Sequence, residues 1–260
     1  SVPPLCKTKR IRAPFAEQSG ALEIIGLSKH YGDVHAVNDL SLTIEPGEIF
    51  TMLGANGAGK TTTLMVSLGF TEPTAGTVKI CGIDVTKDPL EAKKHVAYVS
   101  ENVMLYGNFT ARQNLEFFTK LGGCKDVSDD EYREVMGRVG LQQDAFDRRV
   151  KGFSKGMRQK LGIAIAIMKD AEVILLDEPT SGLDPKSAAE FLQLLAELRA
   201  EDKAIWMTTH DIFRAKEIAD RVGIMVEGRL VQLLTRAELE EHDLEALYVQ
   251  YVSQPTEQVA

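Results

Sequence analysis

The sequence predicts an α/β fold with a mainly parallel sheet, an antiparallel β subdomain near the start of the chain and an inserted helical subdomain. Three observations lead to this prediction. Short apolar runs separated by turns fill residues 21–83, helical periodicity dominates residues 102 to about 162, and strands and helices then alternate up to residue 231. Such alternation is typical of a parallel sheet, because parallel strands need a crossover connection.

The first third of the chain holds most of the predicted strands. The turn signals "EPGE" and "EPTAG" separate its apolar, β-branched runs. A helix with apolar residues at helical spacing should follow Lys60, and Gly69 is placed to end it. We expect the strands of this region at residues 21–25, 36–44, 48–53, 77–83 and 95–99.

The helical insertion begins with a recognisable start signal. Thr110 is followed three residues later by Gln113, which is the spacing of a capping box, and the segment ends at Gly122 and Gly123. Helices are also expected at residues 130–140 and 154–170. The later alternation comprises apolar strands at 173–179 and 204–210, helices at 187–201 and 212–221, and the run 222–231.

Composition is that of an ordinary globular protein, with 44% hydrophobic and 26% charged residues among 260. The net charge of -8 argues weakly against a nucleic-acid partner. The three cysteines are far apart, which favours a reducing cytosol over a disulfide framework. No apolar run approaches the length of a membrane span, so a membrane role would require a partner.

The two ends of the chain differ from the main domain, which we place at residues 21–235 with the helical subdomain at about 102–162. Residues 1–20 have no clear periodicity and read as a flexible tail, whose basic side chains could alternatively contact anionic lipid. Residues 236–260 read as a helical tail. Its apolar residues, which fall roughly along one helical side, are Leu239, Leu244, Leu247, Tyr248 and Tyr251.

The stretch "GANGAGKTTT" follows the apolar run "IFTML" and has the spacing of a phosphate-binding loop, with Gly54, Gly59, Lys60 and Thr61 at the defining positions. Glycines let the backbone curl so that several N–H groups face one concavity, and the helix N-terminus adds its dipole. Lys60 can reach the outer phosphates, and the Thr61 hydroxyl can bind Mg²⁺. The stretch therefore predicts a nucleoside triphosphate site.

Acidic and polar residues follow the later strands. Asp177 and Glu178 end "VILLDEP", where Asp177 would hold Mg²⁺ and Glu178 would orient or deprotonate the attacking water. Ser154 lies just before a helix, where it is either a phosphate contact or a plain N-cap. His210 ends "TTH" and could bind a terminal phosphate, although a histidine at the edge of the core is as reasonable when taken alone.

The order of these motifs resembles the nucleotide-binding subunit of ABC transporters. The phosphate loop is followed by "SKGMRQ", "VILLDEP", "SGLD" and His210, and the resemblance runs from about residue 21 to residue 231. Within that family the chain is most similar to the ATP-binding protein of ABC-2 type exporters, because of "SKGMRQ" and the ending "DLEALYVQYV". The resemblance implies a P-loop ATPase core that binds ATP and Mg²⁺.

The resemblance also implies roles for individual residues. Tyr31 matches the aromatic residue that stacks on adenine. Glu178 and His210 match the catalytic carboxylate and the γ-phosphate contact, Asp177 the metal-side carboxylate, and Asp184 a loop that crosses the dimer. Ser154 and Gly156 match the signature that serves the ATP of a second subunit. The phosphate and Mg²⁺ contacts match Asn56, Gly57, Ala58, Gly59, Lys60, Thr61 and Thr62.

Two positions depart from the family pattern. Glu101 stands where the family usually has a glutamine that touches Mg²⁺, and a carboxylate there binds the metal more strongly but adds negative charge beside the triphosphate. Lys155 stands where the common signature has glycine. Its charge either approaches the nucleotide of the second subunit or points to solvent.

Three functions fit a phosphate loop of this kind. The resemblance favours a transporter ATPase that lies on the cytoplasmic face of the membrane through an integral-membrane permease and pairs with a second copy of itself. The alternative is a soluble ABC-type ATPase acting on nucleic acid or the ribosome, but such proteins generally have paired modules or a long inserted arm, and this chain has a single set of motifs. A non-catalytic regulatory protein would not explain Glu178.

Overall fold

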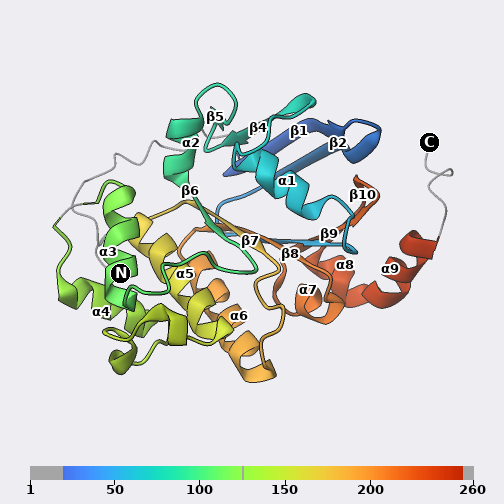
Figure 1. Cartoon of the computed structure of the whole chain (residues 1–260). Helices are drawn as coiled ribbons and strands as arrows, with labels where there is room; N and C mark the ends of the chain where they lie inside the picture. The colour runs from blue at the N-terminus through green and yellow to red at the C-terminus, as the bar shows by residue number, and fades with distance from the viewer. Residues whose placement is uncertain (1–19, 125, 254–260) are drawn as a thin grey trace.

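The computed structural model describes residues 20–124 and 126–253. They form two β-sheets with helices packed around them, so the predicted fold class is confirmed (Figure 1). The predicted N-terminal tail, with its basic side chains, lies outside the described residues.

The larger sheet has the strand order β10-β9-β3-β8-β7-β6 and is parallel except for the β9–β10 pair. Its parallel strands all carry their loops to the same edge, where the polar residues of the sequence analysis gather. The six strands are β3 (Ile49–Leu53), β6 (Val96–Val99), β7 (Val173–Asp177), β8 (Ala204–Thr209), β9 (Arg221–Val226) and β10 (Arg229–Thr235).

The smaller sheet is antiparallel, with the order β2-β1-β4-β5. The run expected as one strand at residues 77–83 is two strands, because Cys81 and Gly82 both have positive φ and form a tight turn. Figure 1 shows this sheet above the larger one, with helix α1 (Lys60–Ser67) beside it. Its strands are β1 (Leu22–Tyr31), β2 (Val34–Ile44), β4 (Ala75–Ile80) and β5 (Ile83–Asp84).

The start of α3 and the end of α1 lie where the local signals predict, whereas α2 was not expected and α7 (Ile212–Ile218) ends three residues earlier than expected. Thr110 caps α3 in a capping box with Gln113, as expected. Helix α1 ends at Ser67, and Gly69 then adopts φ 65 and closes the end of the helix. The first helices of the chain are α1 (Lys60–Ser67), α2 (Pro89–His95), α3 (Ala111–Leu121), α4 (Asp129–Arg138) and α5 (Lys155–Lys169).

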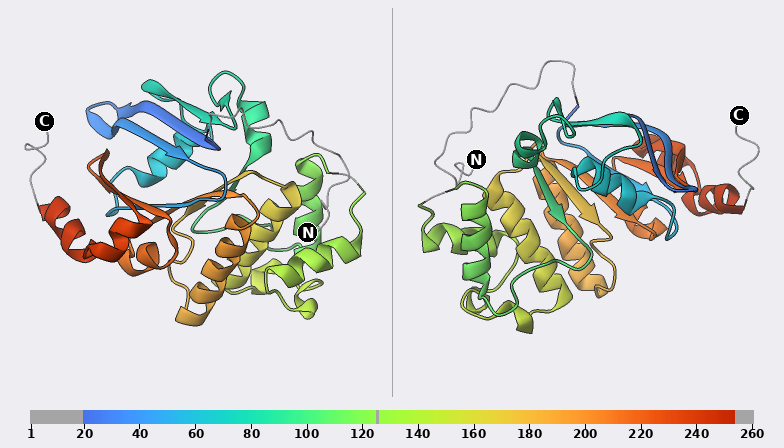
Figure 2. Two further views of the ribbon diagram at one scale, coloured as in Figure 1. Left: turned by 180° about the vertical axis from the view of Figure 1, so that it is seen from behind. Right: turned by 45° about the horizontal axis from the view of Figure 1, so that its top comes forward.

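Two hydrophobic layers hold the larger sheet in place. On β7, Ile174 and Leu176 pack with the helical part of the chain, whereas Val173 and Leu175 pack with α1 and the smaller sheet. This alternation follows from the two-residue repeat of a strand that is buried on both faces. Figure 2 shows α3, α4 and α5 at one end of the molecule, on the far side of the larger sheet from β1 and β2.

The end of the chain differs from the single helical side that was expected. His242 is extended between α8 and α9, and Asp243 accepts hydrogen bonds from the N–H groups at the start of α9. The predicted apolar residues still share one cluster with α7 and β9. The remaining helices are α6 (Pro185–Arg199), α7 (Ile212–Ile218), α8 (Arg236–Glu241) and α9 (Leu244–Ser253).

Two further expectations concern cysteines and the membrane. Cys81 is a free thiol, but Cys124 is disulfide-bonded, so the expectation that the cysteines stay unpaired is wrong at Cys124. Separation along the sequence does not limit which sulfur atoms a fold brings together. Within the described ranges, no helix has the length and apolar character needed to cross a membrane.

Candidate nucleotide site

The loop between β3 and α1 forms the floor of the site. Gly57 and Gly59 have φ values of 84 and 105, which L-residues with side chains rarely adopt. A Cβ added to Gly59 would lie 2.2 Å from the Ala36 carbonyl oxygen, whereas one added to Gly57 would meet nothing within 4 Å. Glycine at position 59 is therefore required by both conformation and space.

Lys60 is the first residue of α1, and its side chain is 5% exposed. Its Nζ donates hydrogen bonds to the carbonyl oxygens of Gly54, at 2.5 Å, and Ala55, at 3.2 Å. It also lies 3.3 Å from Glu178 Oε1. A buried ammonium needs such partners, and these bonds hold it at the mouth of the loop, where an incoming phosphate can replace them.

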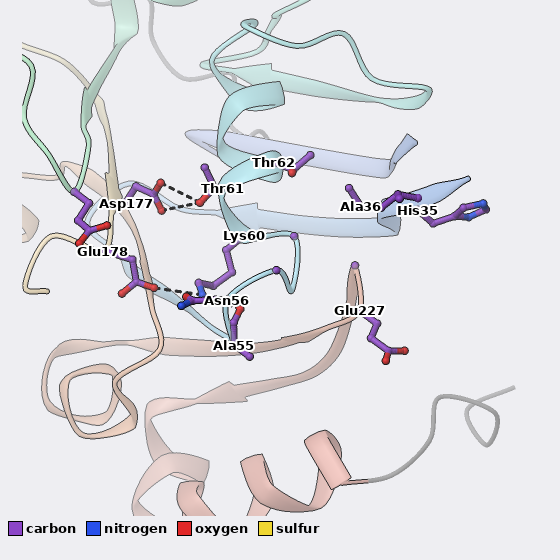
Figure 3. Close-up of a pocket in the computed structure, with 15 residues that line it drawn as sticks. His35, Ala36, Ala55, Asn56, Lys60, Thr61, Thr62, Asp177, Glu178 and Glu227 are labelled. Atoms are coloured by element: carbon purple, nitrogen blue, oxygen red, sulfur yellow. Dashed lines mark hydrogen bonds and ion pairs between the residues drawn. The ribbon is translucent and has the colours of Figure 1, made fainter. Parts of the chain in front are cut away.

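Asp177 ends β7 and faces Thr61 (Figure 3). The Thr61 hydroxyl lies 3.0 Å from Oδ2 of Asp177, and the Thr208 hydroxyl donates to Oδ1 at 2.6 Å. Burial and the neighbouring Asp177 raise the pKa of Tyr98 to about 12. A hydroxyl and a carboxylate at this distance suit Mg²⁺, which takes few protein oxygens and completes its shell with water and phosphate.

Glu178 is held in a strained conformation beside Asp177. Its φ is 47, and its backbone N–H bonds to the carbonyl oxygen and hydroxyl of Thr208. His210 Nδ1 lies 2.9 Å from Glu178 Oε2. The carboxylate is therefore fixed between a lysine and a histidine at the edge where a water molecule and a terminal phosphate would meet.

These residues surround a cavity of about 460 Å³. His35 and Glu227 lie on the opposite side of the phosphate loop from Asp177 and Glu178 (Figure 3). The predicted residues that line the cavity are Asn56, Gly57, Gly59, Lys60, Thr61, Thr62, Glu101, Asp177 and Glu178.

Other predicted residues lie outside this cavity. Tyr31 is 50% exposed and carries the Lys29 ammonium 4.8 Å from its ring centre. Ser154 caps α5 by accepting a hydrogen bond from Met157 N–H, and Asp184 caps α6 in the same way with Ser187. The predicted residues absent from the cavity lining are Tyr31, Ala58, Ser154, Gly156, Asp184 and His210.

Glu101 and Lys155, the two departures from the family pattern, contact each other. Lys155 Nζ lies 3.2 Å from Glu101 Oε1, and Ser181 Oγ donates to the same oxygen at 3.0 Å. Neither expectation for Lys155 describes this arrangement, because its charge is directed to a carboxylate of its own chain. Ser181 and Lys155 both lower the pKa of Glu101, Ser181 more strongly.

Sequence reasoning missed several residues of the site. Thr208 is fully buried and bonds to both carboxylate-bearing residues. Thr208 precedes Thr209 and His210 at the end of an apolar strand, which is a position typical of a site residue. Threonines at strand ends are so common, however, that this position alone does not indicate a function. His35 and Ala36 lie at the start of β2 and Glu227 in the turn between β9 and β10, and none of the three carries a local signal.

Comparison with known proteins gives the family. A sequence model described as "ABC transporter" matches residues 37–181. The chain belongs to the ABC transporter family. It is 36% identical over 239 residues to the ABC transporter ATP-binding protein YhcH of Bacillus subtilis (strain 168), covering 91% of this chain and 76% of that protein. It is 37% identical to the bacitracin transport ATP-binding protein BcrA of Bacillus licheniformis, covering 82% of this chain and 69% of that protein.

A solved structure agrees with this membership. The dimeric bacterial ABC transporter cassette MJ0796 superposes with a TM-score of 0.75 and 26% sequence identity, covering 83% of this chain and 98% of that one. The same cassette is also known in a post-hydrolysis state bound to ADP and Pi. This ABC chain is an ATP-binding protein and an ATPase, as the resemblance of its motifs implied.

Proposed function

We propose that this chain powers a separate integral-membrane permease of the ABC-2 exporter type, working on the cytoplasmic face of the membrane. The observation that carries the proposal is the joining of Lys60, Thr61, Asp177 and Glu178 at one edge of the larger sheet. The bacitracin transport protein among the relatives supports a role in transport.

The proposed roles follow from the geometry. Lys60 and the N–H groups of the phosphate loop bind the β- and γ-phosphates, because the loop is an anion nest at a helix N-terminus. Thr61 and Asp177 would hold Mg²⁺, which neutralises phosphate charge when bound. Glu178 orients the attacking water, and His210 positions both Glu178 and the terminal phosphate.

We propose that the active unit contains two copies of the chain. Ser154, Gly156 and Asp184 lie outside the cavity of their own chain, so the cavity as described lacks the hydroxyl and N–H donors of Ser154 and Gly156. A second copy placed head to tail would bring them over the γ-phosphate. The dimeric cassette among the structural relatives supports this arrangement.

An exposed apolar patch supports a docking surface for the permease. The aromatic patch, defined as Tyr106, Phe109, Phe117 and Leu121, lies at the start of the helical part of the chain. The ring of Tyr106 lies 5.1 Å from that of Phe109 and 4.9 Å from that of Phe117, and Leu121, one turn further along α3, is 73% exposed. Apolar patches of this kind commonly mark interfaces.

The dimer is tested by size-exclusion chromatography with light scattering. Glu178→Gln with MgATP should accumulate as a dimer, because the nucleotide binds but the step that opens the pair is blocked, while the native chain with MgADP should be monomeric. Ser154→Arg should abolish hydrolysis. Ser128→Arg is its matched control, since Ser128 also caps a helix, but that helix is α4. A monomeric Glu178→Gln with saturating ATP, together with a fully active Ser154→Arg, excludes the composite site.

The permease is tested by co-expression with a candidate polytopic membrane protein of the ABC-2 type, which is sought first in the reading frames that neighbour this gene. Leu121→Asp should weaken co-purification at least about fivefold. Leu90→Asp, at a leucine of α2 that is 78% exposed, should leave it unchanged. Equal loss for both variants would exclude the aromatic patch as the docking surface.

A further inference from the structure

The contact between Glu101 and Lys155 joins the end of the larger sheet to the helical part of the chain. Glu101 follows β6, and Lys155 is the first residue of α5, 54 positions later. The backbone at Glu101 is held separately, because Gln159 Nε2 donates to its carbonyl oxygen at 2.9 Å. The Glu101 side chain can therefore change partners without moving its backbone.

The charges around the cavity explain why Glu101 needs a partner. The lining carries the carboxylates of Glu101, Asp177, Glu178 and Glu227 against the ammonium of Lys60. Lys60 already pairs with Glu178. A polyanionic nucleotide is repelled by unpaired carboxylates. A cation beside Glu101 therefore lowers the electrostatic repulsion between the site and the nucleotide.

The Glu101–Lys155 pair is suited to exchange. Glu101 is 44% exposed and Lys155 31% exposed, and an ion pair with this exposure changes an equilibrium by about fivefold at most. A divalent cation brings twice the charge and prefers carboxylate oxygen. It can therefore displace the ammonium from Glu101, while Ser181 keeps the carboxylate at the edge of the cavity.

We propose that Lys155 is a positioning residue that competes with Mg²⁺ for Glu101 and so sets the metal concentration at which the site binds nucleotide tightly. The proposal rests on the proposed nucleotide and metal roles of this cavity. Lys155 acts through the carboxylate of its own chain, and when Mg²⁺ arrives the ammonium is released toward the surface of α5. The two departures from the family pattern are then one device, in which the lysine balances the extra carboxylate.

The test measures binding and not turnover. Isothermal titration calorimetry gives nucleotide affinity over a series of Mg²⁺ concentrations for the native chain, Lys155→Gln, Lys155→Arg, Glu101→Gln and the Lys155→Gln/Glu101→Gln double variant. Lys155→Gln should lower the Mg²⁺ concentration that gives half of the affinity gain by about two- to fivefold, since the competing cation is gone. Lys155→Arg should stay near the native value, because the charge is kept.

The Glu101→Gln background decides the mechanism. There the Lys155→Gln change should leave the Mg²⁺ midpoint unaltered, because the shared carboxylate is absent. An equal shift of the Mg²⁺ midpoint in both backgrounds would mean that Lys155 acts directly on the nucleotide. No shift of the midpoint in the native background would mean that Lys155 does not compete with Mg²⁺. Either result overturns the proposal. Thermal unfolding confirms that each variant folds. A native chain that binds no nucleotide at any Mg²⁺ concentration rejects the proposed site itself.

Discussion

Thr208 offers a sharp test of how the two acidic residues are held. Thr208 is fully buried on β8, and its hydroxyl donates to Asp177 Oδ1 at 2.6 Å. The Thr208 hydroxyl oxygen also accepts a hydrogen bond from the Glu178 N–H at 3.1 Å. Thr208→Val keeps the shape of the side chain and removes both bonds. Thr208→Ser is the matched control, because it keeps the hydroxyl and loses one methyl group.

The expected magnitudes separate the two variants. A hydrogen bond to a charged group contributes about 1.5–3 kcal/mol, so Thr208→Val should lower the free energy of unfolding by about 2 kcal/mol. Loss of a buried methyl group in Thr208→Ser should cost about 1 kcal/mol. The rate of ATP hydrolysis should separate the variants further. It should fall about tenfold or more in Thr208→Val, because Asp177 and Glu178 both lose a hydrogen bond, and less than about threefold in Thr208→Ser.

The assays are urea unfolding of the nucleotide-free chain and phosphate release at saturating MgATP. We expect valine to be the worse substitution in both measurements, although it is the more hydrophobic residue. If Thr208→Val unfolds at the native urea concentration and hydrolyses ATP at the native rate, the hydroxyl does not position the carboxylates. If serine is as inactive as valine, packing of the methyl group matters and the hydrogen bonds do not.

Three other predictions concern the phosphate loop, the C-terminal helices and Glu48, the residue directly before β3. Lys60→Ala should reduce ATP binding or hydrolysis by about a hundredfold or more, through loss of the phosphate-binding cation, and unchanged turnover would reject its role. Truncation after Leu234 should destabilise the chain, since Leu239 and Leu244 are each 1% exposed and each contributes about 1.5–3 kcal/mol; an unchanged urea midpoint would contradict this. Burial raises the pKa of Glu48 above its ordinary value of 4.5. Between the two pKa values the folded chain therefore binds a proton that the unfolded chain has released. The contribution of Glu48 to stability falls as pH rises through this range. Glu48→Gln should remove that fall, so the free energy of unfolding of the variant relative to that of the native chain should rise with pH. If the two free energies run parallel over this pH range, the assignment is wrong.

Local patterns in the sequence were sufficient for much of the fold. The capping box at Thr110 and Gln113 and the helix end at Gly69 were predicted because the partners lie within a few residues of each other. The phosphate loop was equally accessible, because its glycines, Lys60 and Thr61 stand at fixed spacing within a few residues of the end of a buried strand. Asp177 and Glu178 were found because they end a strand whose apolar character is unmistakable.

The tail shows where a local pattern misleads. The apolar spacing from Leu239 to Tyr251 suggested one helical side, and the residues do share a cluster. The sequence did not reveal that His242 is extended and that Asp243 starts a second helix, because a capping aspartate inside a helical pattern looks like an ordinary exposed residue.

By itself the sequence determined the class of fold, the phosphate loop and the acidic strand end, because each depends on residues that are near neighbours along the chain. The tertiary structure alone decided which of these groups touch. Thr61 meets Asp177 across 116 positions, Lys155 meets Glu101 across 54, and Thr208 meets Asp177 across 31. Such contacts depend on strand order and on the packing of α5 against the sheet, which bring distant loops to one edge, and no local spacing encodes that arrangement.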